Sequence, residues 1–278
     1  MYVSIRKLRQ RWQGLQFGQL LDQQGPYTLV FVEGYNHFLI ERRVAEVEAS
    51  RRNPPHDLSD IPTITLDTYP EQSIKTFVIA NKRDISHVMK SVSQLRQLTN
   101  YARHIKQLVT DNKPILSIDF EMFERKQEII LELGIAYGNN NACLDVKHLI
   151  IKEHLKYKNG RHVPDYRNNF LFGTSDIVSL QEMKNILQDY IVKSSIIVAH
   201  GVKTELDFCR SMSLFMNNIQ PIDTGILHQA VHRTGNRVPG LAKCLEHYQI
   251  DNQYHHNGGN DAVRTLMLVQ KLLREPLL

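Results

Sequence analysis

The chain has 278 residues, of which 42% are hydrophobic and 23% are charged, and its formal net charge is +5. This composition is typical of globular proteins and excludes collagen-like, mucin-like and wholly disordered chains. No stretch approaches the roughly 18–20 uninterrupted apolar residues of a membrane-spanning helix, so we expect a soluble protein with no membrane partner.

The three cysteines, Cys143, Cys209 and Cys244, are widely spaced and odd in number. Such spacing predicts neither a disulfide framework nor a cysteine zinc site. It favours a reducing, intracellular compartment, either cytoplasmic or nuclear.

The positive charge is concentrated in the first part of the chain. Residues 1–113 contain 16 Lys and Arg against 11 Asp and Glu, whereas residues 114–278 contain 18 of each. Clustered basic residues favour a polyanionic partner. The extreme N-terminus has four basic residues before its first acid, Asp22. Either a mitochondrial leader or a basic surface helix packed through Trp12 explains this pattern, and we favour the helix.

Residues 1–112 are interpreted as an N-terminal α+β extension of unknown role. The segments 27–33 and 61–80 are rich in β-branched and aromatic residues and predict strands, with a polar Pro-containing loop at 51–60 between them. Apolar residues recur at helical spacing over 86–109, which predicts an amphipathic helix leading into the second region.

Residues 113–278 show a different pattern, in which short apolar strands come first and then alternate with helices. This order predicts an α/β layer fold with a mixed sheet. We expect strands at 113–123, 129–137, 143–151, 194–200 and 221–224, and helices from near Ser175, directly after residue 200, at 240–248 and at 260–274.

Two acids lie on the first of these strands. Asp119 and Glu121 are two residues apart, so both side chains point to the same face of the sheet. Two carboxylates on a buried strand repel each other, and a divalent cation relieves that repulsion. The alternative for this pair alone is a solvated acidic face on an edge strand.

A second group of polar residues follows the strand at 194–200. His200, Glu205 and Asp207 lie where α/β sheets bind ligands, at the carboxyl end of a strand. On a helix, Glu205 and Asp207 are about 200° apart, so at most one of them can face a common site. The alternative role is stabilisation of the helix N-terminus by its acids.

The third group precedes the last helix. His256 lies five residues before Asp261, in a turn in which two glycines permit positive φ. His256 can act as a general base near neutral pH. The alternatives are a polar surface loop for His255 and His256, and a helix cap at Asn260 or Asp261.

Two further groups of polar residues have no assigned catalytic role. Asp223 and Thr224 end the last predicted strand, and we assign them a structural or substrate-side place without a chemical role. Four basic residues are candidates for a substrate channel, although a solvated surface is the usual role of such side chains: Lys203, Arg210, Arg233 and Arg237.

Taken together, four motifs resemble the DEDDh exonucleases, the DnaQ-like branch of the ribonuclease H-like superfamily. They are D-F-E at 119–121, E-L-G-I-A at 132–136, H-G-V-K-T-E-L-D-F at 200–208 and H-N-G-G-N-D-A at 256–262. The last motif, with N-N-F-L-F-G near residue 170, is most similar to the fungal Gfd-like and QDE-2-interacting-protein-like branch. The resemblance covers about residues 113–275.

The resemblance implies a fold and an activity. The fold is a ribonuclease H-like mixed five-stranded sheet with helices on both faces, and the activity is removal of nucleotides from the 3′ end of single-stranded RNA or DNA. Two Mg²⁺ or Mn²⁺ ions would be held by Asp119, Glu121, Glu205 and Asp261. Glu121 and Asp261 would hold the ion beside the attacking water, and His256 would take the proton of that water.

Glu205 departs from the family pattern, which has Asp five residues after the motif histidine. The longer carboxylate either replaces a bridging water or crowds the second ion. The primary hypothesis is therefore a metal-dependent 3′–5′ exonuclease. The alternative is a nucleic-acid-binding or adaptor protein with this fold and weak or no catalysis. A weaker third reading is a scaffold whose acids form a solvated face.

Overall fold

The computed structural model describes residues 27–32, 37–41, 74–79, 97–109, 112–232 and 237–276. The chain divides into two compact units between Arg96 and Gln97, and each unit is described by itself. Within the described residues, every helix is too short or too polar to cross a membrane.

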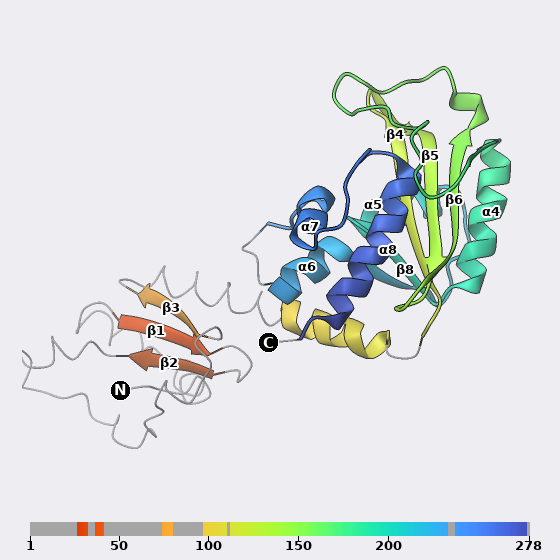
Figure 1. Ribbon diagram of the computed structural model, residues 1–278. Coiled ribbons are helices and arrows are strands. Elements are labelled where there is room, and N and C mark those ends of the chain that lie inside the picture. Colours follow the sequence, from red (N-terminus) through yellow and green to blue (C-terminus); the bar gives the residue numbers. More distant parts are fainter. Residues whose placement is uncertain are drawn as a thin grey trace, which may run out of the picture. The chain divides into compact units, whose positions relative to one another are not determined.

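In the first unit, three strands form an antiparallel sheet in the order β2-β1-β3 (Figure 1). The strands are β1 (Tyr27–Val32), β2 (His37–Glu41) and β3 (Ile74–Ile79). β1 and β3 fall within the strands expected at 27–33 and 61–80, whereas β2 was not expected. The basic N-terminal segment, the loop at 51–60 and residues 86–96 of the predicted helix lie outside the described residues.

The second unit contains a mixed sheet of six strands in the order β7-β6-β5-β4-β8-β9. β4, β5 and β6 are antiparallel neighbours, whereas β8 runs parallel to β4, and β9 runs parallel to β8. The strands are β4 (Ile115–Phe123), β5 (Lys126–Gly138), β6 (Cys143–Ile151), β7 (Ser175–Val178), β8 (Ile196–Ala199) and β9 (Gln220–Asp223). The predicted α/β, ribonuclease H-like fold class is confirmed, with one strand more than the five expected.

The additional strand lies where a helix was expected. Ser175–Val178 forms β7, parallel to β6, and the helix α4 (Leu180–Lys193) begins five residues later than predicted. Ser179 sets that start, because its side chain accepts a hydrogen bond from the main-chain N–H of Glu182 and the Glu182 side chain caps Ser179 in return. This capping box provides acceptors for the main-chain N–H groups of Ser179 and Glu182, and a helix that began earlier would lack these bonds.

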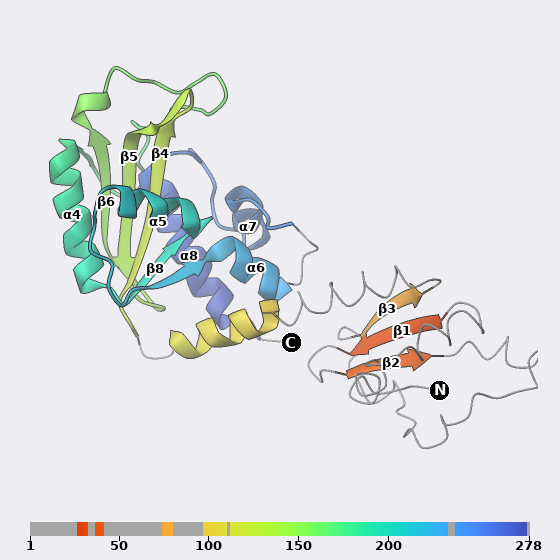
Figure 2. The same cartoon turned by 180° about the vertical axis from the view of Figure 1, so that it is seen from behind.

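Helices cover both faces of the sheet (Figures 1 and 2). One face packs against a helix at 97–108 and against α6, α7 and α8, and the other packs against α4 and α5. The remaining elements are the 3-10 helix η4 (Lys152–His154) and the helices α5 (Val202–Ser211), α6 (Thr224–His232), α7 (Leu241–His247) and α8 (Gly258–Arg274).

The helix at 97–108 shares the core of the second unit. Ala102, Ile105 and Val109 are at most 2% exposed and belong to the same apolar cluster as residues of α6 and α8. The expected domain boundary at 112/113 follows this helix, and the division between the compact units precedes it.

Cys143, Cys209 and Cys244 are free thiols. Cys209 and Cys244 are buried in the two apolar clusters, and Cys143 is exposed.

Candidate active site

The sheet and the last helix bring three carboxylates together. Asp119 and Glu121 lie on the central strand β4, opposite Gly134 and Glu132 of β5. Asp261 lies in the first turn of α8, and one carboxylate oxygen from each of Asp119, Glu121 and Asp261 lies within 4.8 Å of the other two. Residues 142 positions apart in the chain therefore form one acidic group.

Glycines allow α8 to approach the sheet this closely. A Cβ atom at Gly134 would lie 1.8 Å from the carbonyl oxygen of Gly258, and one at Gly258 would lie 3.2 Å from the carbonyl oxygen of Asp119. The helix is capped by Asn257, which accepts a hydrogen bond from the main-chain N–H of Asn260. The alternative of a cap at Asn260 or Asp261 is therefore wrong: the cap lies three or four residues earlier, and Asp261 lies near the acids of β4.

The acidic group is electrostatically unfavourable without a cation. Burial, and then the charges of Glu121 and Asp261, raise the pKa of Asp119 well above its usual range. Burial also raises the pKa of Glu121. Asp261 is 2% exposed, and its Oδ1 has no hydrogen-bond partner among the described residues. The nearest cation to this oxygen is Arg264 Nη1, at 3.5 Å. Carboxylates that repel one another, one of them with an oxygen that lacks a hydrogen bond, fit a divalent cation, because a cation offsets the repulsion and supplies a ligand bond.

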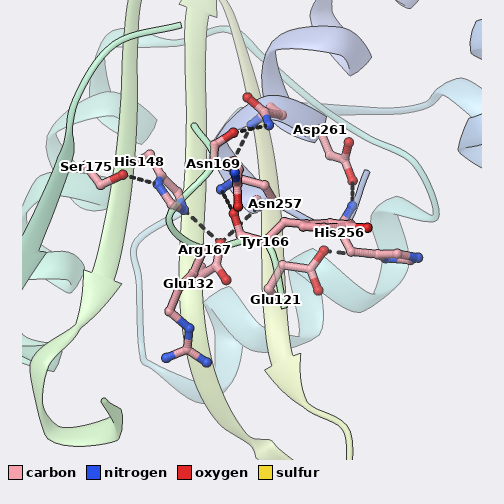
Figure 3. A network of polar contacts seen from close by, with 12 residues as sticks. Glu121, Glu132, His148, Tyr166, Arg167, Asn169, Ser175, His256, Asn257 and Asp261 are labelled. Atoms are coloured by element: carbon pink, nitrogen blue, oxygen red, sulfur yellow. Dashed lines mark hydrogen bonds and ion pairs between the residues drawn. The ribbon is translucent and has the colours of Figure 1, made fainter. Parts of the chain in front are cut away.

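Two stacked histidines flank the acids, with ring centroids 4.1 Å apart. His256 Nδ1 lies 3.7 Å from Glu121 Oε1, and this contact raises the pKa of His256. His255 Nδ1 lies 2.7 Å from Asp261 Oδ2. The same oxygen accepts the main-chain N–H of His256 at 2.8 Å (Figure 3). His256 has φ of 71°, a left-handed backbone that costs a non-glycine residue on the order of 1 kcal/mol.

Glu205 and Asp207 separate on α5 as their helical spacing predicts. Asp207 is exposed and forms ion pairs with Lys203 at 3.1 Å and Arg210 at 2.7 Å. Glu205 is 6% exposed, and its Oε2 has no hydrogen-bond partner among the described residues. Burial, aided by the charges of Asp223 and Glu121, raises the pKa of Glu205 to about 7. Glu205 lies near enough to Glu121 for the two charges to repel each other. Asp207 does not contribute to the site.

His200, the motif histidine, has both ring nitrogens engaged in structural contacts. Nδ1 lies 3.0 Å from Thr224 Oγ1, and Nε2 lies 2.9 Å from the carbonyl oxygen of Pro239. Asp223 accepts the main-chain N–H of Val202 at 3.1 Å and that of Gly225 at 2.9 Å. The His200 side chain thus holds α6 to the end of β8, and Asp223 and Thr224 both make structural contacts there.

A buried relay across three strands was not predicted. Glu132 Oε2 lies 2.8 Å from His148 Nε2, and His148 Nδ1 lies 2.7 Å from Ser175 Oγ (Figure 3). The same Glu132 oxygen accepts the main-chain N–H of Gly258 at 3.2 Å, and therefore anchors the first turn of α8. Glu132 stands in the E-L-G-I-A motif, which is the one sequence signal that could have identified it.

Polar side chains of α8 hold the long segment that follows η4. Asn260 accepts the main-chain N–H of Leu171 at 2.9 Å and donates to the carbonyl oxygen of Asn169 at 3.0 Å. Asn257 donates to the carbonyl oxygen of Tyr166 at 2.9 Å (Figure 3). These contacts fix the segment beside the acidic group.

Arg264, which was also not predicted, stabilises the opposite side of Asp261. It is 1% exposed, and its Nη1 lies 3.5 Å from Asp261 Oδ1. Its Nη2 donates to Asp251 Oδ2 at 3.1 Å and to the carbonyl oxygen of Gln253. Arg264 therefore ties the turn before α8 to the helix that carries Asp261.

Comparison with known proteins connects this geometry to relatives. Residues 114–272 match the family DEDDh_C, described as DNA polymerase III subunit epsilon-like, C-terminal domain. Uncharacterized nucleolar protein C2C4.08 of Schizosaccharomyces pombe is 34% identical over 157 residues, which are 53% of this chain and 63% of the relative. Good for full DBP5 activity protein 2 of Saccharomyces cerevisiae is 25% identical over 223 residues, 66% of this chain and 39% of the relative.

A third relative, Uncharacterized protein YDR514C of Saccharomyces cerevisiae, is 24% identical over 206 residues, 60% of this chain and 42% of the relative. The chain thus spans less than two thirds of the length of each of these fungal relatives. Because the family match covers more than half of the chain, the protein belongs to the DEDDh, DNA polymerase III epsilon-like family of ribonuclease H-like folds.

Proposed function

We propose that this protein is a metal-dependent 3′–5′ exonuclease that hydrolyses phosphodiester bonds of single-stranded RNA or DNA. The observation that carries the proposal is the gathering of Asp119, Glu121 and Asp261 within 4.8 Å, with His256 beside Glu121. Membership of the DEDDh family supports a nuclease-type activity.

The donor set suits two Mg²⁺ or Mn²⁺ ions. Hard oxygen ligands from carboxylates, completed by substrate phosphate, are what Mg²⁺ prefers. In this proposal Asp119 would contribute a ligand to both ion sites, Glu121 and Asp261 would contribute to the first, and Glu205 to the second. When bound, the ions stabilise the attacking and leaving oxygens of an in-line displacement.

His256 is the proposed general base. Its Nδ1 faces Glu121, which leaves Nε2 as the nitrogen that accepts the proton of the attacking water. Glu121 raises the pKa of His256, and so makes this nitrogen more basic. The side chain is 39% exposed, so the proton can pass on to solvent. His255 is proposed to orient Asp261 through its 2.7 Å contact.

We propose a nuclear location for this activity. The Schizosaccharomyces pombe relative is named as a nucleolar protein, and this supports a nuclear rather than a cytoplasmic site. The mitochondrial alternative depends on residues 1–20, which lie outside the described part of the chain.

Glu205 supports a second candidate, a nucleic-acid-binding or adaptor protein with little catalysis. Its carboxylate is one methylene longer than the family aspartate, and it lies in a site where Oε2 is already buried. If the longer side chain occupies the place of the second ion, substrate binds without efficient cleavage.

The test is to incubate the purified chain with 5′-labelled single-stranded RNA and DNA in Mg²⁺, in Mn²⁺ and in EDTA. We expect a ladder that shortens from the 3′ end, is lost in EDTA and is weakened at least about 100-fold by Asp119→Ala, since even outer-shell changes cost 10–100-fold. Asp207→Ala is the matched control, because Asp207 is an exposed acid on α5. It should cleave like the native chain.

The variant Glu205→Asp separates the two candidates. If the native chain binds single strands without shortening them in either metal, whereas Glu205→Asp shortens them, the adaptor function is correct. If neither chain cleaves, the exonuclease proposal is refuted.

A further inference from the structure

A second cluster of metal-ligating side chains lies away from the acids, on α6 and α7. His228 and His232 are four residues apart and therefore lie on the same face of α6. His247 ends α7, and one ring nitrogen from each of the three histidines lies within 4.8 Å of the other two. None of the three belongs to the acidic group.

His228 is unusual because it is buried without a hydrogen-bond partner. It is 3% exposed, and neither Nδ1 nor Nε2 has a hydrogen-bond partner among the described residues. A buried polar group without a partner costs about 1–3 kcal/mol, so native structures nearly always provide one. The other two rings lie close to it, with centroids 4.5 Å (His232) and 5.2 Å (His247) away. They offer π-faces and lone pairs but no anionic acceptor.

The environment keeps the ring in the state that binds metals. Burial, and then the neighbouring His232 and His247, lower the pKa of His228 to about 4, so the neutral imidazole with a free lone pair dominates at neutral pH. Burial likewise lowers the pKa of His232.

The cluster also has the outer contacts that metal-binding histidines usually have. A ligating imidazole normally uses its other nitrogen in a hydrogen bond that fixes the ring. His232 Nε2 lies 2.6 Å from Tyr248 Oη, and Tyr248 in turn lies beside the carboxylate of Glu275. This chain of contacts orients His232 and leaves its Nδ1 available.

We propose that His228, His232 and His247 hold one Zn²⁺ ion, which ties the C-terminal end of α6 to the C-terminal end of α7. Three imidazoles match Zn²⁺, whereas Mg²⁺ requires oxygen ligands. Zn–N bonds of 2.0–2.1 Å place ligand nitrogens about 3.3 Å apart in a tetrahedron. The nitrogens lie within 4.8 Å of one another, so the rings would turn toward the ion to reach that value, and the exposed His247 side chain has room to do so.

The site differs in its role from the acidic group. The ion would complete the bonding of a buried histidine and join two helices that pack on the same face of the sheet. The N-terminal residue of α6, Thr224, contacts His200, so the position of α6 also affects the end of β8. This role is structural and does not depend on exonuclease activity.

The experiment measures Zn²⁺ binding to a variant in which Asp261 of the acidic group is replaced by Asn. Asp261 belongs to both other groups that could hold a metal in the described part of the chain, so Asp261→Asn weakens both. Untagged Asp261→Asn protein is loaded with Zn²⁺, desalted and assayed for Zn²⁺ per chain, with affinity measured by competition against a chelator. We expect one ion per chain, and a rise in the unfolding temperature with Zn²⁺ but not with Mg²⁺.

Adding His247→Gln should weaken Zn²⁺ binding at least about 100-fold, since changes outside the ligand shell already cost 10–100-fold. His247 is exposed, so its substitution disturbs packing less than a substitution of His228 or His232 would. The matched control is His104→Gln, an exposed histidine on the helix at 97–108 that should leave Zn²⁺ binding unchanged.

Two results would overturn the proposal: no retained Zn²⁺ in Asp261→Asn, or full retention after His247→Gln. Circular dichroism checks the fold of each variant. If His247→Gln is unfolded, the visible spectrum of Co²⁺ bound to the Asp261→Asn protein decides. A tetrahedral spectrum supports the three-histidine site, and an octahedral spectrum or none refutes it.

Discussion

The close approach of β5 to α8 makes Gly134→Ala the most informative single substitution. The new Cβ would lie 1.8 Å from the carbonyl oxygen of Gly258, 2.2 Å from its carbonyl carbon and 2.7 Å from the nitrogen of Gly259. All three are main-chain atoms, so no side-chain rotation relieves the overlap. The first turn of α8 must retreat by more than an ångström for ordinary contacts to return.

The cost follows from this geometry. Overpacking by one methyl group typically costs 1–3 kcal/mol, and a clash with main chain lies at the upper end, so we expect about 3 kcal/mol. At 2–4 °C for each kcal/mol in a unit of this size, the unfolding temperature falls by about 6–12 °C. Because the same turn carries Asp261, a displacement of about 1 Å should also reduce the proposed nuclease activity about 100-fold.

The assay is thermal unfolding followed by circular dichroism, together with cleavage of labelled single strands. Gly240→Ala is the matched control, since a Cβ there has nothing within 4 Å and Gly240 has φ of −71°. That change should stay within about 0.5 kcal/mol. If Gly134→Ala unfolds and cleaves like Gly240→Ala, the helix is not positioned by this approach and the reasoning is wrong.

Three further predictions concern the same site. The pKa of Glu205 is raised to about 7, so in EDTA the buried side chain loses its proton as pH rises from about 4.5 through 7. Its contribution to the free energy of unfolding is lost over the same pH range. Glu205→Gln should therefore be more stable than the native chain at pH 8, by up to about 3 kcal/mol, and equal to it near pH 4.5 in urea unfolding. Arg264→Met leaves the buried carboxylate of Asp261 without its cation and should cost about 3 kcal/mol in EDTA, partly restored by Mg²⁺. An equal loss in EDTA and in Mg²⁺ would contradict that account. Asn260→Ala should cost about 1–3 kcal/mol and speed hydrogen exchange at Leu171, whose N–H loses its acceptor. Unchanged exchange there would show that the segment is held by other contacts.

The sequence predicted those parts of the fold that depend on local patterns. Buried apolar runs identified β4, β5, β6 and β8, because each run is long enough to be recognised without its neighbours. β9 was expected at 221–224 although Q-P-I-D carries no such run. β7 was missed because S-D-I-V carries no apolar run, and its strand conformation comes from pairing with β6. α6 was not predicted: most residues of T-G-I-L-H-Q-A-V-H are buried, the polar His228 and Gln229 included, so burial there does not follow the apolar pattern of the sequence.

The same distinction explains which site residues could be anticipated. Asp119 and Glu121 were found because two-residue spacing on a strand fixes a shared face, and Asp261 was found through its motif. Glu132 and Arg264 act through contacts that only the folded chain creates, such as the bond from Gly258 to Glu132, 126 residues away. No spacing rule encodes such a contact.

The two edges of the six-stranded sheet have a consequence for how the protein behaves at high concentration. Both edge strands, β7 and β9, are only four residues long, and so offer few free main-chain groups to the strand of another molecule. In β9, Pro221 has no N–H to donate, and in β7 the charged Asp176 is exposed. Edge-to-edge pairing between copies is thereby discouraged, which protects the hydrophobic strands of this sheet from amyloid-like aggregation.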